Sequence, residues 1–204
     1  PIYKRCHCWF QQLEDLAAVD ASSDVGRADW RRILERVIPY VDFFVPSIEE
    51  LCFMLDRQRF EAWQLRSNGE DITDSPDLER DIQPLAGECM KLGAKVLMIK
   101  CGVKGMYYRT AGQEILGSIG KNLSLNVEEW KEKEGFERSY IPERVLSGTG
   151  AGDTGIAAFL CVMLEGKALE SCMYLAAAKG ASCVAAYDAL SGLKSFEEFC
   201  VCNA

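Results

Sequence analysis

Apolar residues along the chain follow two patterns, helical spacing and short continuous runs. From Asp29, large apolar side chains recur every three or four residues, which predicts an amphipathic helix that Pro39 ends. The run 41–45 is rich in β-forming residues and predicts a buried strand. A second helix followed by a strand is predicted further along, with an amphipathic helix over 77–92 and an apolar strand over 94–101. Helices alternating with apolar runs favour an α/β fold built on a parallel sheet.

The glycines that follow the second strand predict a tight turn. Gly102 and Gly105 lead into a return strand at 106–108 that we expect to be antiparallel. The remaining predictions, in chain order, are a strand at 16–20, a loop at 21–27, a helix and loop over 57–75, a short helix at 127–133, two helices rich in small residues at 154–164 and 168–185, and a closing helix at 196–202. No repeat, low-complexity tract or linker separates these segments, so we expect one domain over residues 1–204.

Composition and charge narrow the class of protein. The 204 residues are 49% apolar and 26% charged, as in soluble globular domains. A formal net charge of −8 disfavours binding to the phosphate backbone of nucleic acids. No apolar run is long enough to cross a bilayer and no signal peptide is visible, so we expect no membrane partner and a cytoplasmic location.

Ten cysteines raise the question of a disulfide framework or a metal site. Six of them lie in apolar or helical stretches, where cysteine behaves as a small hydrophobe: Cys52, Cys89, Cys101, Cys161, Cys172 and Cys183. The pairs Cys6/Cys8 and Cys200/Cys202 lack the usual zinc-knuckle spacing, and His7 is the only histidine. The sequence therefore predicts no metal held by cysteines and disfavours Ser-His or Cys-His nucleophilic chemistry.

The chemistry of the chain is concentrated in the glycine-rich stretch 147–155, which is followed by the apolar run 156–160. A glycine-rich turn that opens a helix lets backbone N–H groups converge, and the helix dipole adds positive potential there. Asp153 is a carboxylate beside this predicted anion site. A base next to an anion hole can deprotonate a hydroxyl and stabilise the phosphoryl group that it attacks.

Two other interpretations of this stretch stay open. Residues 150–155 match the GxGxxG string of dinucleotide-binding folds, but 140–146 make a poor preceding strand and no second strand follows. A Walker A loop is excluded because no Gly-Lys-Ser/Thr closes the turn. The simplest alternative is a glycine-rich helix start with a capping aspartate.

The sequence Thr149-Gly150-Ala151-Gly152-Asp153, followed by a helix of small apolar residues, resembles the C-terminal signature of the ribokinase-like (PfkB) carbohydrate kinases. The resemblance implies that Asp153 takes the proton from a sugar hydroxyl. It also implies that Gly150, Ala151 and Gly152 form the anion hole and that Thr149 contacts nucleotide. Ser147 stands where the family usually has an aspartate that helps hold a monovalent cation, so a K⁺ site is doubtful.

The segment Pro46-Ser47-Ile48-Glu49-Glu50 has a structural and a functional interpretation. Ser47 can cap the helix that follows, and both acids suit its first turn. The resemblance adds the Pro-Asn-x-x-Glu element of the family, in which Ser47 replaces the asparagine and lies at the nucleotide, and Glu50 aligns with the glutamate that organises magnesium. We favour magnesium binding through Glu50 over capping alone.

The turn after the second strand resembles the family's Thr-x-Gly-x-x-Gly element beneath the nucleotide phosphates. The resemblance places Lys100, Gly102, Lys104 and Gly105 there, with Lys100 at the threonine position. Lys100 could contact a phosphate directly or be an ordinary solvated lysine. In the family the helix at 168–185 forms a wall of the adenine pocket, which makes Ala178 and Ser182 candidates, although tight packing explains them equally well.

The resemblance covers residues 29–204 and leaves 1–28 atypical. It implies a three-layer α/β/α fold with a largely parallel sheet, here without the N-terminal sugar-binding part and its lid. We expect ATP-dependent transfer of a phosphoryl group to a sugar hydroxyl, with ATP, Mg²⁺ and a small sugar as ligands. The alternative is a truncated, catalytically inactive nucleotide-binding or remnant protein. A homodimer is expected only where the N-terminal part is present.

Overall fold

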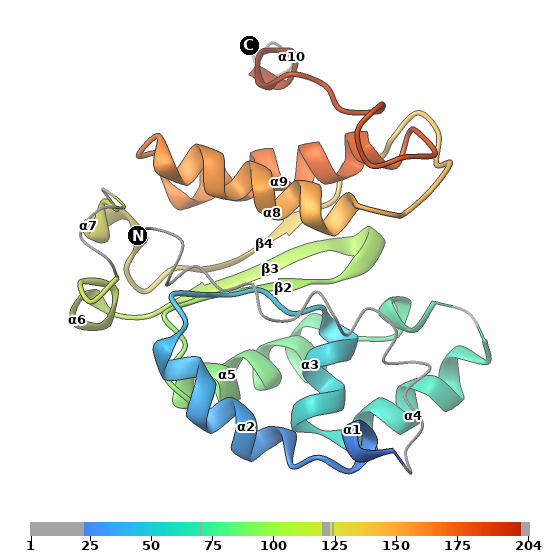
Figure 1. Ribbon diagram of the computed structural model, residues 1–204, viewed down its shortest axis with the longest axis vertical. Coiled ribbons are helices and arrows are strands. Elements are labelled where there is room, and N and C mark those ends of the chain that lie inside the picture. The colour runs from blue at the N-terminus through green and yellow to red at the C-terminus, as the bar shows by residue number, and fades with distance from the viewer. Residues whose placement is uncertain (1–22, 70, 120–122, 124, 201–204) are drawn as a thin grey trace.

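A four-stranded sheet lies between two layers of helices in the computed structural model, which describes residues 23–69, 71–119, 123 and 125–200 (Figure 1). The strands, in spatial order, are β1 (Phe43–Phe44), β2 (Val96–Lys100), β3 (Gly105–Thr110) and β4 (Glu134–Arg138). Helices α8 and α9 lie on one side, and the layer containing α2 to α5 lies on the other. The predicted α/β class and three-layer architecture are confirmed.

The sheet itself is mixed rather than largely parallel over the residues described. β1 and β2 run parallel, whereas β2–β3 and β3–β4 are antiparallel pairs. The turn of 3₁₀-helix at Gly102–Lys104 reverses the chain directly after β2, so β3 returns beside it. β4 was missed because Glu134, Glu137 and Arg138 are charged and the whole strand is half-buried or exposed, so this edge strand has no apolar run to mark it.

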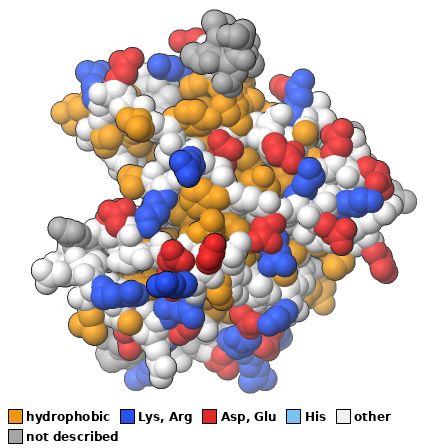
Figure 2. All heavy atoms as spheres, turned by 180° about the vertical axis from the view of Figure 1, so that it is seen from behind, with side chains coloured by type: hydrophobic (Ala, Val, Ile, Leu, Met, Phe, Trp, Pro, Cys, Tyr) orange, Lys and Arg blue, Asp and Glu red, His pale blue; other side chains and the backbone are white. Residues whose placement is uncertain are grey.

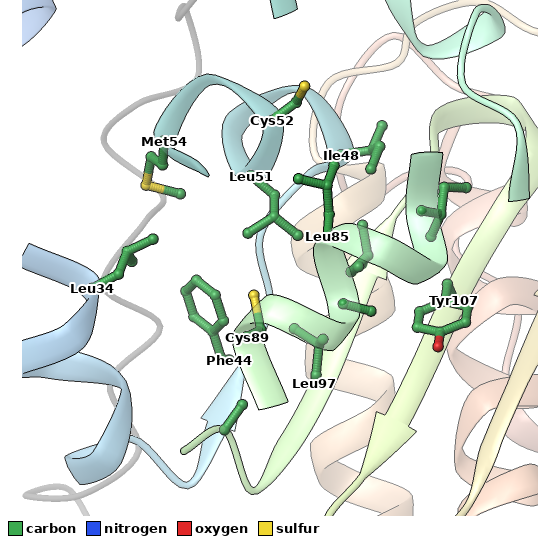
Figure 3. Packing of buried hydrophobic residues seen from close by; sticks show 14 of the residues in the cluster. Leu34, Phe44, Ile48, Leu51, Cys52, Met54, Leu85, Cys89, Leu97 and Tyr107 are labelled. Atoms are coloured by element: carbon green, nitrogen blue, oxygen red, sulfur yellow. The ribbon is translucent and has the colours of Figure 1, made fainter. Parts of the chain in front are cut away.

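The first helical layer packs on the face of the sheet that carries Phe44, Leu97, Ile99 and Tyr107. Figure 3 shows Phe44 and Leu97 among the apolar side chains of the covering helices. These elements are α1 (Asp24–Arg27), α2 (Trp30–Val37), α3 (Ile48–Leu55), α4 (Arg57–Ser67) and α5 (Gln83–Lys91), with short 3₁₀ turns at Ile38–Tyr40 and Ile72–Asp74 and a π-helical turn at Leu78–Ile82.

The second layer packs on the opposite face, which carries Phe43, Val96, Met98 and Met106. Adjacent residues of β1 and β2 thus enter different cores, as the alternation of side chains along a strand requires. The layer contains α8 (Ala151–Leu164) and α9 (Leu169–Cys183) beside the sheet, α6 (Gln113–Leu116) and α7 (Val127–Trp130) at one end, and the short α10 (Phe196–Cys200). None of the helices described is long and apolar enough to span a membrane.

Several helices begin or end at residues other than those predicted from the sequence. The helix expected over 77–92 starts as a π-helical turn and becomes α-helical only at Gln83, whereas Gly93 ends it with φ +97° as a C-terminal glycine should. α8 begins at Ala151, three residues before its predicted start, and the helix predicted at 127–133 ends at Trp130. The segment 21–27 contains α1 instead of being a loop throughout. The strand predicted at 16–20 lies outside the described residues.

The six cysteines described in detail are all free thiols, and five of them are buried as small hydrophobes. Cys161 differs from the prediction that all six are buried hydrophobes, because it lies on α8 with its side chain exposed. No group of metal-ligating side chains large enough to hold an ion by itself occurs in the described part of the chain. Cys6, Cys8 and Cys202 lie outside it, and the side chain of Cys200 is not described.

Candidate functional site

A cavity of about 640 Å³ opens where β1 and β2 end. Four parts of the chain meet there: the β1–α3 junction, the β2–β3 turn, the first turn of α8 and one face of α9. Segments 71–73 and 139–148 form the rim, and Figure 2 shows the surface hollowed at its left edge. Carboxyl ends of parallel strands are where α/β sheets place their ligands, so this is the expected position for a binding site.

The β1–α3 junction brings Ser47 to the cavity and fixes it by a complete capping box. The Ser47 N–H donates to Glu50 Oε2 at 2.7 Å, and the Glu50 N–H donates to Ser47 Oγ at 3.3 Å. Ser47 also pairs with Lys100 in a parallel bridge, through which the Lys100 N–H donates to the Pro46 carbonyl. These bonds hold the ends of β1 and β2 side by side at the cavity.

The β2–β3 turn needs glycine at both ends. Gly102 has φ +56°, and a Cβ there would clash with the Thr73 side chain. Gly105 has φ +127°, and a Cβ there would clash with the backbone of β4. Both glycines line the cavity, whereas Lys104 turns away from it and donates to the carbonyls of Asp74 and Pro76 at 2.9 and 3.0 Å.

The first turn of α8 forms another part of the cavity wall. Gly150 is the N-cap with φ +81°, which a side chain could adopt only under strain, and a Cβ there would clash with Ala189. Ala151 and Gly152, the first helical residues, line the cavity, so the N-terminus of the helix lies at its wall, where the Ala151 N–H donates to the Gly148 carbonyl at 3.3 Å. Asp153 follows in the same turn and is exposed.

Lys100 from β2 reaches this first turn. A Cβ built on Gly152 would lie 3.4 Å from Lys100 Cδ and 3.6 Å from Nζ, so the ammonium group lies directly beside the helix start. Lys100 is the only Lys or Arg among the described residues that line the cavity. The ammonium and the positive end of the helix dipole therefore act on the same volume, which favours a bound anion.

α9 supplies a wall of small side chains. It lies so close to α8 that a Cβ on Gly155 would be 3.1 Å from the Ala176 carbonyl, and a Cβ on Gly180 would be 3.1 Å from the Ala151 carbonyl. Four residues of α9 line the cavity, namely Ala176, Ala177, Gly180 and Ala181, together with Val184 directly after the helix. Together with Ile141 and Val145 of the rim they make this end of the cavity mainly apolar.

The structure brings six of the predicted residues together in the wall of the cavity: Ser47, Lys100, Gly102, Gly105, Ala151 and Gly152. Seven others do not line it: Glu50, Lys104, Thr149, Gly150, Asp153, Ala178 and Ser182. Gly150 and Asp153 adjoin lining residues in α8. Ala178 and Ser182 are buried on another face of α9, where Ser182 Oγ donates to the Lys179 carbonyl at 2.8 Å. Ser147 Oγ accepts a hydrogen bond from the Thr149 N–H at 3.2 Å.

Sequence reasoning passed over Glu49, Asp71 and the apolar rim. Glu49 lines the cavity, and its Oε2 is buried without a hydrogen-bond partner among the residues described. Burial raises the pKa of the Glu49 carboxyl, and hydrogen bonds from its own backbone and from Ser47 oppose this only in part. The motif alignment pointed to the next residue, Glu50, and only the rotation of α3 distinguishes the two.

A family of known proteins and several of its members are similar in sequence to this chain. The sequence profile of the pfkB family of carbohydrate kinases matches residues 6–195. The ribokinase of Arabidopsis thaliana is 34% identical over 104 residues, which are 50% of this chain and 22% of that protein. An uncharacterised sugar kinase of Archaeoglobus fulgidus is 26% identical over 113 residues, 55% of this chain and 37% of that protein.

Solved structures show the same fold. Arabidopsis thaliana ribokinase, solved in complex with ribose and ATP, superposes with a TM-score of 0.55 at 25% identity over 79% of this chain and 40% of that one. Aminoimidazole riboside kinase of Salmonella enterica, solved with its riboside and an ATP analogue, gives 0.54 at 17% identity over 84% and 45%. The chain therefore spans less than half the length of these relatives.

Proposed function

The chain belongs to the pfkB family of carbohydrate kinases, and on that premise we propose that its cavity binds ATP and that its residues serve the transfer of the γ-phosphoryl group to a sugar hydroxyl. The similarity to a ribokinase solved with ribose and ATP supports both ligand classes. Because the chain spans less than half of that relative, the complete reaction is part of the proposal.

The observation that carries the proposal is the meeting of Lys100 with the first turn of α8. A phosphate group bound there would face the N–H groups of Gly150, Ala151 and Gly152 and the Lys100 ammonium. Phosphoryl transfer depends chiefly on positioning and on stabilising the charge of the transferred group. These residues therefore supply the anion hole that the reaction needs.

Asp153 supplies the base. It is the third residue of α8, exposed, and one position from the lining residue Gly152. A carboxylate there can accept the proton of an acceptor hydroxyl as that oxygen attacks the phosphorus atom. In this scheme Lys100 and the amides bind the phosphoryl group, and Asp153 activates the acceptor.

The apolar end of the cavity suits the base of a nucleotide. Ile141 and Val145 of the rim line the same cavity as the small residues Ala177 and Ala181 of α9. A flat heterocycle can be held between such walls, with the phosphates directed toward the turn 102–105. The wall of the adenine pocket, which the resemblance placed at Ala178 and Ser182, is therefore proposed for the neighbouring residues Ala177 and Ala181.

Magnesium, when bound, would neutralise phosphate charge and orient the transferred group. The orphaned oxygen of Glu49 in the cavity wall fits this ion, because magnesium in nucleotide sites takes one or two carboxylates besides the phosphates.

The first test is thermal unfolding of this chain with Mg-ATP, with NAD as the control ligand. A ligand at about 100 times its dissociation constant adds about 2.7 kcal/mol to the free energy of unfolding, which is a measurable shift. We expect stabilisation by ATP and none by NAD. Stabilisation by NAD alone would favour the dinucleotide-binding alternative, and no shift with either ligand would contradict the proposal.

A second candidate function is nucleotide binding without phosphoryl transfer, which is favoured because Lys100 lines the cavity whereas Asp153 does not. Release of ADP that depends on an added sugar separates the two functions, with ribose as the first sugar of the panel. Stabilisation by ATP without any sugar-dependent ADP release would favour the binding protein over the kinase.

A further inference from the structure

A buried thiol lies behind the glycine turn that opens α8. Cys183 is the last residue of α9, is fully buried and does not line the cavity. Its Sγ lies 3.6 Å from the carbonyl oxygen of Thr149 and 3.5 Å from that of Ala189. A thiol has one proton to donate, so it serves these two acceptors in alternation. Cys183 thus links the glycine turn to the chain that follows α9.

The loop after α9 packs against the same turn, at the end of the helix pair where α8 begins (Figure 1). Ala189 fills the space that a Cβ on Gly150 would need, and Cys183 Sγ would be 3.7 Å from that Cβ. Asp188 Oδ1 shapes the loop by accepting the N–H groups of residues 190 and 191 at 2.9 and 2.8 Å. The turn is therefore supported from behind by both the thiol and the loop.

The bond from the thiol fixes the peptide group between Thr149 and Gly150. This peptide is trans, since the described chain contains no cis peptide bond. In a trans peptide the carbonyl and the following N–H point in opposite directions within one plane. Because the Thr149 carbonyl is directed to the buried thiol, the Gly150 N–H is turned away from Cys183.

The Gly150 N–H donates to no protein group in the described part of the chain. Its neighbours differ, because the Thr149 N–H donates to Ser147 Oγ and the Ala151 N–H donates to the Gly148 carbonyl. A free N–H at the start of a helix is a donor that an anion can use. Gly150 therefore offers this donor directly beside Ala151, which lines the cavity.

We infer that Cys183 is a positioning residue for the phosphate end of the proposed ATP site. Its thiol holds the Thr149 carbonyl on the buried side and thereby presets the Gly150 N–H for a bound phosphate. The inference rests on the proposed function and gives a role to a residue outside the glycine motif. A donor that is already oriented needs no reorganisation when the charge arrives, which is how fixed dipoles stabilise anions. The thiol itself touches no ligand and acts through this one peptide group.

The same helix contains a matched control, Cys172. It is also fully buried, and its Sγ donates to a backbone carbonyl, that of Lys167, at 3.8 Å. Cys172 belongs to the first turn of α9 and does not line the cavity. Cys172→Ala therefore removes the same atoms from the same helix, but far along the chain from the glycine turn.

The test measures the dissociation constant of Mg-ATP by calorimetry and the free energy of unfolding in urea. The unaltered chain is compared with Cys183→Ala, Cys183→Ser and Cys172→Ala. We expect Cys183→Ala to weaken ATP binding about threefold to tenfold, the equivalent of one neutral hydrogen bond. Cys183→Ser should stay within about twofold of the unaltered chain, because its hydroxyl can donate to the same carbonyl. Cys172→Ala should lose stability and keep its ATP affinity.

A second measurement uses the unaltered chain and so does not depend on the folding of a variant. In ¹H–¹⁵N correlation spectra, the amide proton of Gly150 should move downfield when Mg-ATP is added, because it then donates to a phosphate oxygen. In Cys183→Ala the same shift should be smaller, since the peptide is no longer held.

Four results would overturn the inference. The first is an ATP dissociation constant in Cys183→Ala equal to that of the unaltered chain. The second is equal weakening in Cys183→Ser, and the third is equal weakening in Cys172→Ala. The fourth is a Gly150 amide that does not respond to Mg-ATP. Each of these leaves the ATP site standing, whereas failure of the unaltered chain to bind Mg-ATP would overturn the proposed function and the inference together.

Discussion

The side chain of Lys100 lies across Gly152, with its ammonium group beside the first turn of α8. A residue at the end of a strand thus meets the start of a helix more than 50 positions later in the sequence. A Cβ at 152 would lie 3.4 Å from Lys100 Cδ, an ordinary van der Waals distance, so the lysine packs directly over this position. It joins the two sources of positive potential in the cavity.

Replacing this lysine should weaken ATP binding. Lys100→Met removes the ammonium and keeps the aliphatic part that packs over Gly152. Hydrogen bonds to charged groups are worth about 1.5–3 kcal/mol, so we expect the dissociation constant of ATP to rise about tenfold to a hundredfold. Calorimetric titration measures it, with Lys91→Met on α5 as the surface control. An unchanged constant in Lys100→Met would leave the lysine as a solvated residue.

A side chain at Gly150 should destabilise the protein. Gly150→Ala places a Cβ at φ +81° and against Ala189, so a left-handed conformation costing about 1–2 kcal/mol is combined with a steric clash. We expect the free energy of unfolding in urea to fall by at least that amount. Gly148→Ala is the matched control, since nothing lies within 4 Å of its Cβ. Equal stability of the two variants would contradict the role of Gly150.

Removing the cap of α3 should cost stability. In Ser47→Ala the Glu50 N–H loses its side-chain acceptor, and caps of this kind contribute about 1 kcal/mol. Denaturant unfolding should show this loss, whereas Ser67→Ala, at the exposed end of α4, should change little. If Ser47→Ala were as stable as the unaltered chain, the capping box would not contribute to stability.

Asp153 should be needed for transfer and not for binding. If the chain releases ADP in the presence of a sugar, Asp153→Asn should lower that rate by about 10²–10⁴-fold, the usual contribution of a general base. ATP affinity should stay close to that of the unaltered chain. Asp24→Asn on α1 controls for loss of a surface charge. Near-normal turnover in Asp153→Asn would exclude its role as base.

The cysteines should differ sharply in reactivity. Burial raises the pKa of Cys89, Cys101 and Cys172 to about 12, so these thiols stay protonated at pH 8 and react slowly. Cys161 is exposed on α8 and should be alkylated first among the six described thiols, as peptide mapping after a short pulse can show. Cys161→Ser should remove that signal. Rapid alkylation of Cys89 in the native protein would contradict its burial.

The elements that the sequence predicted well are those with local causes. Pro39, Ser47 and Gly93 mark helix ends because a fixed φ, a capping oxygen and a left-handed conformation act within one turn of the chain. The glycines at 102, 105 and 150 marked turns for the same reason. The apolar runs of β1 and β2 identified the buried strands, since each contributes to both cores.

The sequence did not determine which residues of a helix line the cavity, because this depends on the rotation of the helix about its axis. The motif singled out Glu50, and the small residues of α9 pointed to Ala178 and Ser182, whereas the cavity is lined by Glu49, Ala177 and Gly180. Periodicity shows which residues share a helix face, but the rotation that brings a face to the cavity is set by packing against other elements. β4 was missed because it is a strand through its pairing with β3, and its own residues do not form a strand-like pattern.

The sequence by itself showed the resemblance to the family through its motifs. It also determined most of the helices and strands and the glycine turns, because these elements follow from local backbone preferences and residue spacing. Only the tertiary structure decided that Lys100 meets Gly152 and that Glu49 lines the cavity. Those relations join residues whose positions are fixed by the packing of helices on both faces of the sheet, which local pattern does not encode.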